Sequence, residues 1–266
     1  MMDIFKRNLA PISDEAWAEI NERAETVINA QLTTRDSLKV NGPFGLSYTA
    51  VPTGRLDLID NKKSNIKLGL YNNQKLVETR ISFELSQWEL DNILRGAKDI
   101  NLDALEDAAM EIARFEDDVV YNGHPSANIT GLMNEAAHQK TIKLESQQIL
   151  LEVANALIDL RNSFVEGPFN FVVDKALYEA LNKVHGSKLL RFIVEEMIGG
   201  RVIVSEMIKG GLLLPVKHDD LEFTIGQEYT IGYESHDHKN IKLFIMNSFT
   251  LRVLDDSILV KFVVES

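Results

Sequence analysis

A long β-hairpin with few residues to cover it is the feature that most constrains the fold of this chain. Apolar residues alternate with other residues at Leu56 and Leu58, and again at Ile66, Leu68 and Leu70. The polar residues 60–65 separate the two runs and are typical of a turn. Because an isolated hairpin is only marginally stable in water, we expect this one to pack against a neighbour, which could be another subunit.

The rest of the sequence mixes helical and strand patterns, which predicts an α+β fold. Ser13 is a suitable N-cap for a first helix. The apolar face of that helix is expected to contain Trp17, Ile20, Ala24, Val27, Ile28 and Leu32. Further helices are expected after the capping-box pattern Ser86-Gln87-Trp88-Glu89, along an apolar stripe from Leu105 through Phe115 to Asn122-Gly123, and over 147–161, 175–184 and 188–198. Strands are expected at 38–40, at 81–85 and in several segments of 221–264.

The composition argues against several classes of chemistry and partner. The chain has no cysteine, which removes thiolate nucleophiles, zinc–thiolate sites and disulfides. Its formal net charge is −12 and it lacks any run of three basic residues, so we expect no nucleic-acid partner. No stretch approaches 18 uninterrupted apolar residues, and the first residues lack the apolar region of a secretory signal. We therefore expect a cytoplasmic protein that does not contact membranes.

Motifs that carry catalysis are missing from the sequence. There is no G-x-S-x-G elbow, P-loop, H-E-x-x-H or G-x-G-x-x-G. We interpret His236-Asp237-His238 as a solvated loop between strands rather than a metal site. The acidic run Glu116-Asp117-Asp118 lacks the Glu-x-x-His pairs of di-iron bundles, so we interpret it as a solvated helix face. The chain is therefore predicted not to be an enzyme and to require no metal.

Short segments spread over nearly the whole chain carry a family resemblance. They are Leu9-Ala10-Pro11-Ile12-Ser13 before Trp17, Asn41-Gly42-Pro43-Phe44-Gly45, the run from Phe83 to Asn92, Phe115 to Val119 with Asn122-Gly123, Glu166-Gly167-Pro168-Phe169, Gly226-Gln227-Glu228 and Ile231-Gly232-Tyr233-Glu234. In order, spacing and total length they resemble encapsulin shell proteins, the bacterial and archaeal nanocompartment family that is also described as linocin-like or bacteriocin-like.

The resemblance implies the fold of tailed-phage major capsid proteins, with a peripheral domain, an axial domain and an extended hairpin loop. By this analogy, residues 1–40 form an N-terminal helix region on the inner wall, and 50–75 form the extended loop. The peripheral domain takes 76–134 and 221–266, and the axial domain takes 135–220. The uncovered hairpin deduced from the residues alone agrees with the extended loop.

The implied function is a subunit that self-assembles into a closed icosahedral shell around a cargo enzyme. The resemblance makes the cargo a ferritin-like iron-storage protein or a peroxidase, held by its C-terminal targeting tail. A viral or prophage capsid subunit is an alternative, against which the lack of a basic patch argues. A hydrolase or antibacterial protein is a further alternative, against which the missing motifs argue.

Three sets of residues match functional places in the family. Ile28, Leu32, Arg35 and Leu38 match the strip that docks the cargo tail, although Ile28 and Leu32 would look the same as core residues of the first helix. Arg80 and Trp88 match a flavin site on the shell surface of some members, although Trp88 could simply pack at its helix. The loop His185-Gly186-Ser187-Lys188 would approach the five-fold axis and line a pore. Flavin is thus an optional cofactor and none is required.

Overall fold

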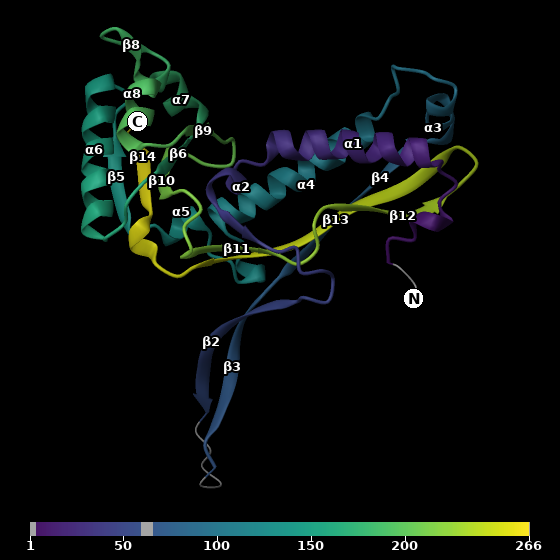
Figure 1. Ribbon diagram of the computed structural model, residues 1–266, viewed down its shortest axis with the longest axis horizontal. Coiled ribbons are helices and arrows are strands. Elements are labelled where there is room, and N and C mark those ends of the chain that lie inside the picture. Colours follow the sequence, from purple (N-terminus) through teal and green to yellow (C-terminus); the bar gives the residue numbers. More distant parts are fainter. Residues whose placement is uncertain (1–3, 60–65, 266) are drawn as a thin grey trace.

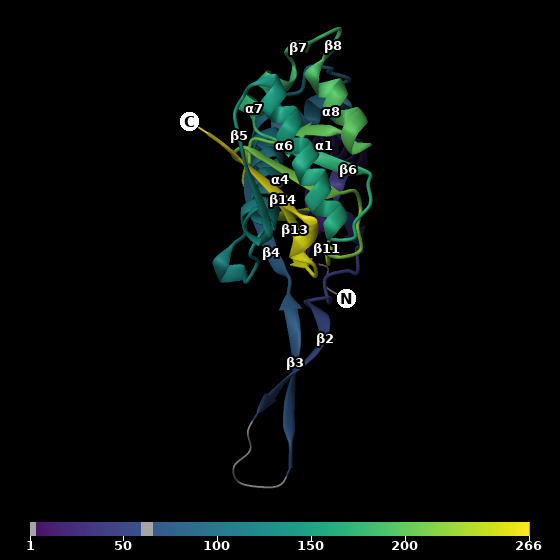
Figure 2. The same cartoon turned by 90° about the vertical axis from the view of Figure 1, so that its left-hand side faces the viewer.

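The chain forms two lobes and a projecting hairpin in a computed structural model that describes residues 4–59 and 66–265. Figure 1 shows an elongated lobe that contains the N-terminus, a second lobe beside it, and a hairpin that points away from both. The view in Figure 2, from the side of the second lobe, shows that the hairpin leaves the body from one narrow end. None of the helices within the described ranges is long and apolar enough to cross a membrane.

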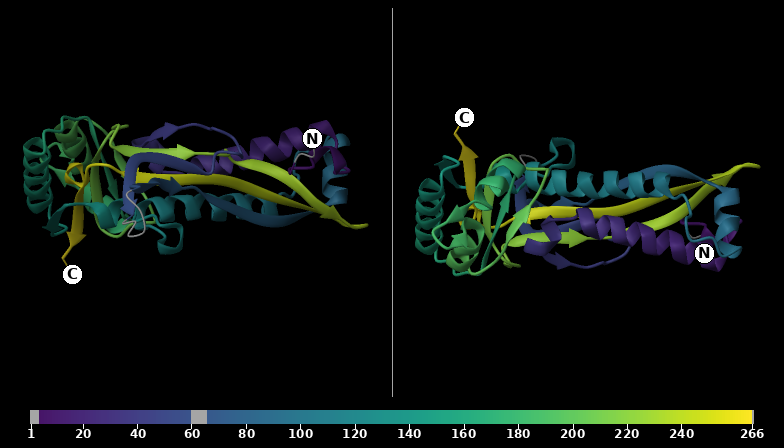
Figure 3. Two further views of the ribbon diagram at one scale, coloured as in Figure 1. Left: turned by 90° about the horizontal axis from the view of Figure 1, so that it is seen from below. Right: turned by 90° about the horizontal axis from the view of Figure 1, so that it is seen from above.

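A five-stranded sheet forms the centre of the elongated lobe, and two long helices lie along it (Figure 3). Its strands are β1 (Lys39–Asn41), β4 (Val77–Ser86), β11 (Leu221–Ile225), β12 (Thr230–His236) and β13 (Asn240–Val253). The helices of this lobe are α1 (Asp14–Gln31), α2 (Thr34–Ser37), α3 (Gln87–Leu94) and α4 (Asp103–Asn122). The long strand β13 pairs with β4 on one side, and with β12 and then β11 on the other.

A second five-stranded sheet, in the order β5-β14-β10-β6-β9, forms the other lobe. Its strands are β5 (His138–Ile142), β6 (Phe169–Val173), β9 (Val202–Val204), β10 (Gly211–Pro215) and β14 (Val260–Val264). The helices here are α5 (Leu132–Glu135), α6 (Ser146–Asn162), α7 (Lys175–Leu181) and α8 (Leu190–Ile198). All five side chains of β6 and all five residues of β10 are buried, as expected for central strands covered on both faces.

The first helix begins where the sequence predicts. Ser13 Oγ accepts a hydrogen bond from Ala16 N at 3.2 Å and so caps α1. Trp17, Ile20 and Ala24 are buried against α4 and the sheet, whereas Val27 is only partly buried. The N-cap residue therefore identified the start of α1, and amphipathic periodicity identified most of its buried face.

The predicted hairpin consists of β2 (Ala50–Ile59) and β3 (Leu68–Lys75), which pair in antiparallel register. Leu58 is 83% exposed and Tyr71 is 79% exposed. The subunit itself therefore leaves large apolar side chains of the hairpin uncovered, as the sequence indicated. The predicted polar turn, residues 60–65, lies outside the described residues.

Several local predictions are wrong in detail. Ser86 precedes α3, but its side chain makes no capping hydrogen bond. Phe115 is 39% exposed and does not continue the buried stripe of α4. The helices expected at 175–184 and 188–198 are shortened, because β7 (Val184–His185) and β8 (Lys188–Leu189) pair as a small hairpin between α7 and α8.

Candidate docking cleft

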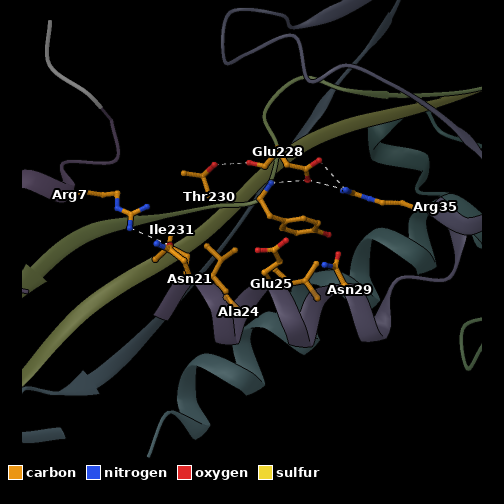
Figure 4. Close-up of a pocket in the computed structure, with 12 residues that line it drawn as sticks. Arg7, Asn21, Ala24, Glu25, Asn29, Arg35, Glu228, Thr230 and Ile231 are labelled. Atoms are coloured by element: carbon orange, nitrogen blue, oxygen red, sulfur yellow. Dashed lines mark hydrogen bonds and ion pairs between the residues drawn. The ribbon is translucent and has the colours of Figure 1, made fainter. Parts of the chain in front are cut away.

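A cleft of about 420 Å³ lies between α1 and the start of β12 (Figure 4). This volume is at the lower end of the range of about 300–1,000 Å³ that is usual for ligand pockets. Asn21, Ala24, Glu25, Ile28 and Asn29 line it from α1, and residues 228–231 line it from the sheet. Ile28, Ile231 and Ile245 are buried and form an apolar floor. The cleft thus combines an apolar base with polar side chains at its rim.

One edge of β12 adjoins this cleft. Within residues 4–59 and 66–265, β12 pairs with β13 alone, so its other edge has no partner strand. Tyr233 N donates a hydrogen bond of 2.7 Å to Phe5 O, which covers part of that edge. The segment from Glu228 to Ile231 faces the cleft instead. A strand edge beside an apolar groove is an arrangement that can accept an extended peptide.

A buried ion pair supports the wall of the cleft. Arg35 Nε donates to Glu116 Oε1 at 2.7 Å, and Arg35 Nη2 donates to Glu116 Oε2 at 2.9 Å. Arg35 Nη1 also donates to both carboxylate oxygens of Glu228, at 2.9 and 3.1 Å. The Arg35 guanidinium lies 5.1 Å from the centre of the Tyr229 ring. Arg35 therefore joins α4 to the segment that borders the cleft.

The acidic run of α4 is a correction to the sequence analysis. Glu116 and Asp117 are 0% and 1% exposed, so they are not a solvated helix face; only Asp118 is exposed. Asp117 accepts four hydrogen bonds, from the backbone N and the hydroxyl of both Thr33 and Thr34. Burial of such charges requires partners, and the chain supplies them from the α1–α2 junction.

Burial shifts the pKa values of Glu116, Asp117 and Arg35. Burial raises the pKa of Glu116 by more than the hydrogen bonds and charge of Arg35 lower it. Burial likewise raises the pKa of Asp117 against the effect of the Thr33 and Thr34 hydrogen bonds. For Arg35, burial lowers the pKa, but the hydrogen bonds and charge of Glu116 outweigh it and the net shift is upward. Arg35 therefore stays a cation at every ordinary pH.

The four predicted docking residues are not brought together at one surface. Ile28 and Arg35 line the cleft. Leu32 is 9% exposed and packs in the core between α1 and α4. Leu38 is 1% exposed and belongs to a buried cluster that extends from the second lobe to α4, β11 and β13, so its side chain offers no surface to a tail in this subunit. The predicted cation, Arg35, is engaged by two carboxylates.

Arg80 and Trp88 are also separated within one subunit. The Arg80 guanidinium lies 4.3 Å from the centre of the Phe244 ring, and Arg80 lines a groove with Phe115 and Ile112 that does not include Trp88. Arg80 lies six residue positions before the end of β4 at Ser86, about 20 Å at the usual rise of a strand. Trp88 is 67% exposed, with Arg95 near its ring. A flavin held jointly by both residues of one subunit does not fit this geometry.

The predicted pore loop and histidine group occupy exposed turns. His185-Gly186-Ser187-Lys188 forms the tip of the β7–β8 hairpin at the end of the second lobe, where Gly186 has a positive φ of 64° (Figure 1). His236 is the exposed last residue of β12, and Asp237 and His238 lie in the turn between β12 and β13. The described part of the chain contains no group of three His, Cys, Asp or Glu side chains placed to hold a metal ion.

Sequence reasoning missed the residues that build most of the cleft. Glu228 and Tyr229 border it, and Asn29 and Glu25 project towards it from α1 (Figure 4). Glu228 lies in the segment Gly226-Gln227-Glu228 that carried the family resemblance, which is the one signal that pointed to it. Nothing in the sequence paired Glu228 with Arg35, since 193 positions separate them.

Solved structures of known proteins identify the fold. A virus-like particle from Pyrococcus furiosus has a TM-score of 0.67 at 15% identity, with 92% of this chain and 98% of that chain covered. The capsid of Myoviridae phage XM1 has a TM-score of 0.57 at 14% identity, with 85% and 89% covered. The fold is therefore that of phage-type capsid proteins.

The chain belongs to the family described as encapsulating protein for peroxidase, whose profile matches residues 2–250. A type 1 encapsulin shell protein of Rhodococcus erythropolis is 31% identical over 252 residues, which are 94% of this chain and 95% of the relative. A type 1 encapsulin shell protein of Rhodospirillum rubrum is 31% identical over 263 residues, which are 95% of this chain and 94% of the relative. The resemblance found in the sequence is confirmed, and the chain is a self-assembling encapsulin shell subunit.

Proposed function

We propose that this subunit closes into an icosahedral shell around a cargo enzyme and that the cargo's tail docks in the cleft between α1 and β12. The observation that carries this proposal is the open edge of β12 beside an apolar floor. The family's description, which names a peroxidase as the encapsulated protein, supports a peroxidase as cargo, and a ferritin-like iron-storage protein is the second candidate.

An extended tail fits this cleft as an added strand. Its backbone would pair with the residue 228–231 segment where the Phe5 contact ends, and its apolar side chains would rest on Ile28 and Ile231. Each aliphatic side chain that is fully buried contributes about 1.5–3 kcal/mol, so one tail binds only moderately. A multimeric cargo enzyme gains further because it presents several tails at once.

The shell subunit is proposed to have no catalytic activity of its own. Its relatives are named as shell proteins, which supports a structural role. Flavin binding at the exposed Trp88, which would need groups from outside the subunit, stays a prediction, and so does the cytoplasmic location. Cargo-free shells are expected to show no peroxidase, ferroxidase or hydrolase turnover. Turnover by shells that contain one polypeptide would contradict this role.

Mass spectrometry of shells purified from the native source tests the docking function. A second polypeptide should be present, and Asn29→Trp should reduce its amount, because the indole would fill the cleft from an exposed position. Glu22→Trp is the matched control, since Glu22 is exposed on α1 but does not line the cleft. Full loading of Asn29→Trp shells would show that the tail binds elsewhere.

A further inference from the structure

Glu116 fixes the wall of the cleft without lining it. Its carboxylate is fully buried and holds two nitrogens of Arg35, while the third nitrogen of Arg35 reaches Glu228. Glu228 Oε1 also accepts a hydrogen bond of 3.0 Å from Tyr229 N. Arg35, Glu228 and Tyr229 all line the cleft. These three residues form one wall of the cleft. Glu116 therefore fixes the position of this wall through the guanidinium of Arg35.

The sheet also holds the Glu116 carboxylate. Asn247 on β13 donates from Nδ2 to Glu116 Oε2 at 2.7 Å, and Thr79 on β4 donates a hydrogen bond to Asn247 Oδ1. Asn247 is 1% exposed. The hydrogen-bonded chain thus runs from β4 through the core to the cleft. Because Asn247 and Arg35 come from different elements and both donate to this carboxylate, Glu116 has one position in which all these bonds form.

We propose that Glu116 is a positioning residue for cargo docking: its ionised carboxylate holds Arg35 against Glu228, and protonation of Glu116 releases this wall of the cleft. This inference rests on the proposed docking function. A neutral carboxyl keeps fewer acceptor sites and loses its charge, so its hydrogen bonds to the guanidinium weaken. Arg35 then remains held by Glu228, which is half-exposed and can move with it.

Burial favours proton uptake by Glu116, while its charged and titratable neighbours act in both directions. Arg35 faces it from α2 and Tyr229 from the segment before β12, and both lower its pKa, whereas Asp117 is its neighbour on α4. Glu228 contacts the other side of the Arg35 guanidinium. Burial raises the pKa of Glu116, and the negative charge of Asp117 raises it further. Proton uptake therefore begins at a higher pH than the value of about 4.3 for an exposed glutamate.

Hydrogen–deuterium exchange of assembled shells tests the proposal. Protection factors, which correct for the effect of pH on intrinsic exchange, are measured for residues 228–231 and for the last turn of α1. Wild-type shells should lose protection there by about tenfold between neutral pH and mild acid, the effect of losing one charge-assisted hydrogen bond. Glu116→Gln shells should show the low protection already at neutral pH and should not change in acid.

Glu106→Gln is the matched control, because Glu106 lies on the same helix and pairs with Arg23 of α1 at 2.7 Å outside the cleft. This variant should keep the wild-type profile. If Glu116→Gln does not assemble, Arg35→Lys serves instead, since one ammonium cannot hold Glu116 and Glu228 in the same fork geometry. Unchanged protection at residues 228–231 in Glu116→Gln or Arg35→Lys, or in acidified wild-type shells, would overturn the positioning role.

Cargo content separates this proposal from the docking function. Glu116→Gln shells should contain about tenfold less of the second polypeptide than wild-type shells when purified near neutral pH, in parallel with the lost protection. Wild-type shells that never contain a second polypeptide would contradict the docking function, while the exchange measurement would still decide whether Glu116 holds the wall. Equal loading and equal protection in both proteins would contradict the positioning role alone.

Discussion

Thr34 and Asp117 are joined twice through one carboxylate oxygen: Thr34 N and Thr34 Oγ1 both donate to Asp117 Oδ1, at 3.2 and 2.6 Å. Thr33 makes the same pair of bonds to Oδ2, at 2.8 and 2.6 Å. The carboxylate thereby caps the start of α2 from outside that helix and fixes the junction that follows α1. Since Arg35 is the next residue, Asp117 also determines where the cation of the cleft can lie.

Asp117→Asn should destabilise the subunit by about 2–3 kcal/mol. The amide nitrogen of asparagine cannot accept a hydrogen bond, so the backbone N and the hydroxyl of one threonine would lose their acceptor in the core. Chemical denaturation of the variant would measure the loss. Asp118→Asn is the control, since Asp118 is exposed and accepts a hydrogen bond from Asn122 Nδ2, and its effect should stay within about 0.5 kcal/mol. Equal stability of the two variants would show that the four bonds to Asp117 contribute little.

The pH dependence of stability should run opposite to that of ordinary paired carboxylates. Burial raises the pKa of Glu116 in the folded chain above its unfolded value of about 4.3. The stabilisation linked to its proton is then fully present below that unfolded pKa and is lost as the pH rises through the folded pKa. The free energy of unfolding of wild type minus that of Glu116→Gln should therefore increase from neutral pH towards mild acid. A difference that falls on acidification would contradict this sign.

Replacement of Leu58 and Tyr71 on the hairpin by aspartate should prevent assembly without unfolding the subunit. Both side chains are exposed in the single chain, so the fold loses little, whereas each apolar contact with a neighbour contributes up to about 1.5–3 kcal/mol. Mass photometry and circular dichroism would measure particle size and fold. Asn72→Asp, an exposed polar position on β3, is the control. Normal shells from the double variant would place the hairpin outside the contacts between subunits.

Gly123→Ala should cost more than Gly96→Ala, although both glycines have a φ of 83°. At Gly96 no atom lies within 4 Å of an added Cβ, so only the backbone conformation opposes alanine, at about 1–3 kcal/mol. At Gly123 the added Cβ would overlap the Thr130 carbonyl oxygen. Thermal unfolding of both variants gives the comparison, and equal midpoints would mean that the Thr130 loop moves aside without cost.

The sequence by itself determined the family, the fold class and several of the elements. The cap at Ser13, the apolar face of α1, the end of α4 at Gly123 and the uncovered β2–β3 hairpin all follow from local patterns. Such patterns are local because capping, turn geometry and periodicity depend on residues a few positions apart.

Only the tertiary structure decided which charges are buried and where the cleft lies. Glu116 looks like a surface residue in the sequence, yet its partner Arg35 is 81 positions away and Glu228 is 193 positions from Arg35. A buried carboxylate is stable only where the fold places hydrogen-bond donors next to it. When those donors belong to other elements, they cannot be deduced from the residues near the carboxylate in the sequence. For the same reason the burial of Leu38 in the cluster that joins the two lobes could not be deduced from its place beside the first helix.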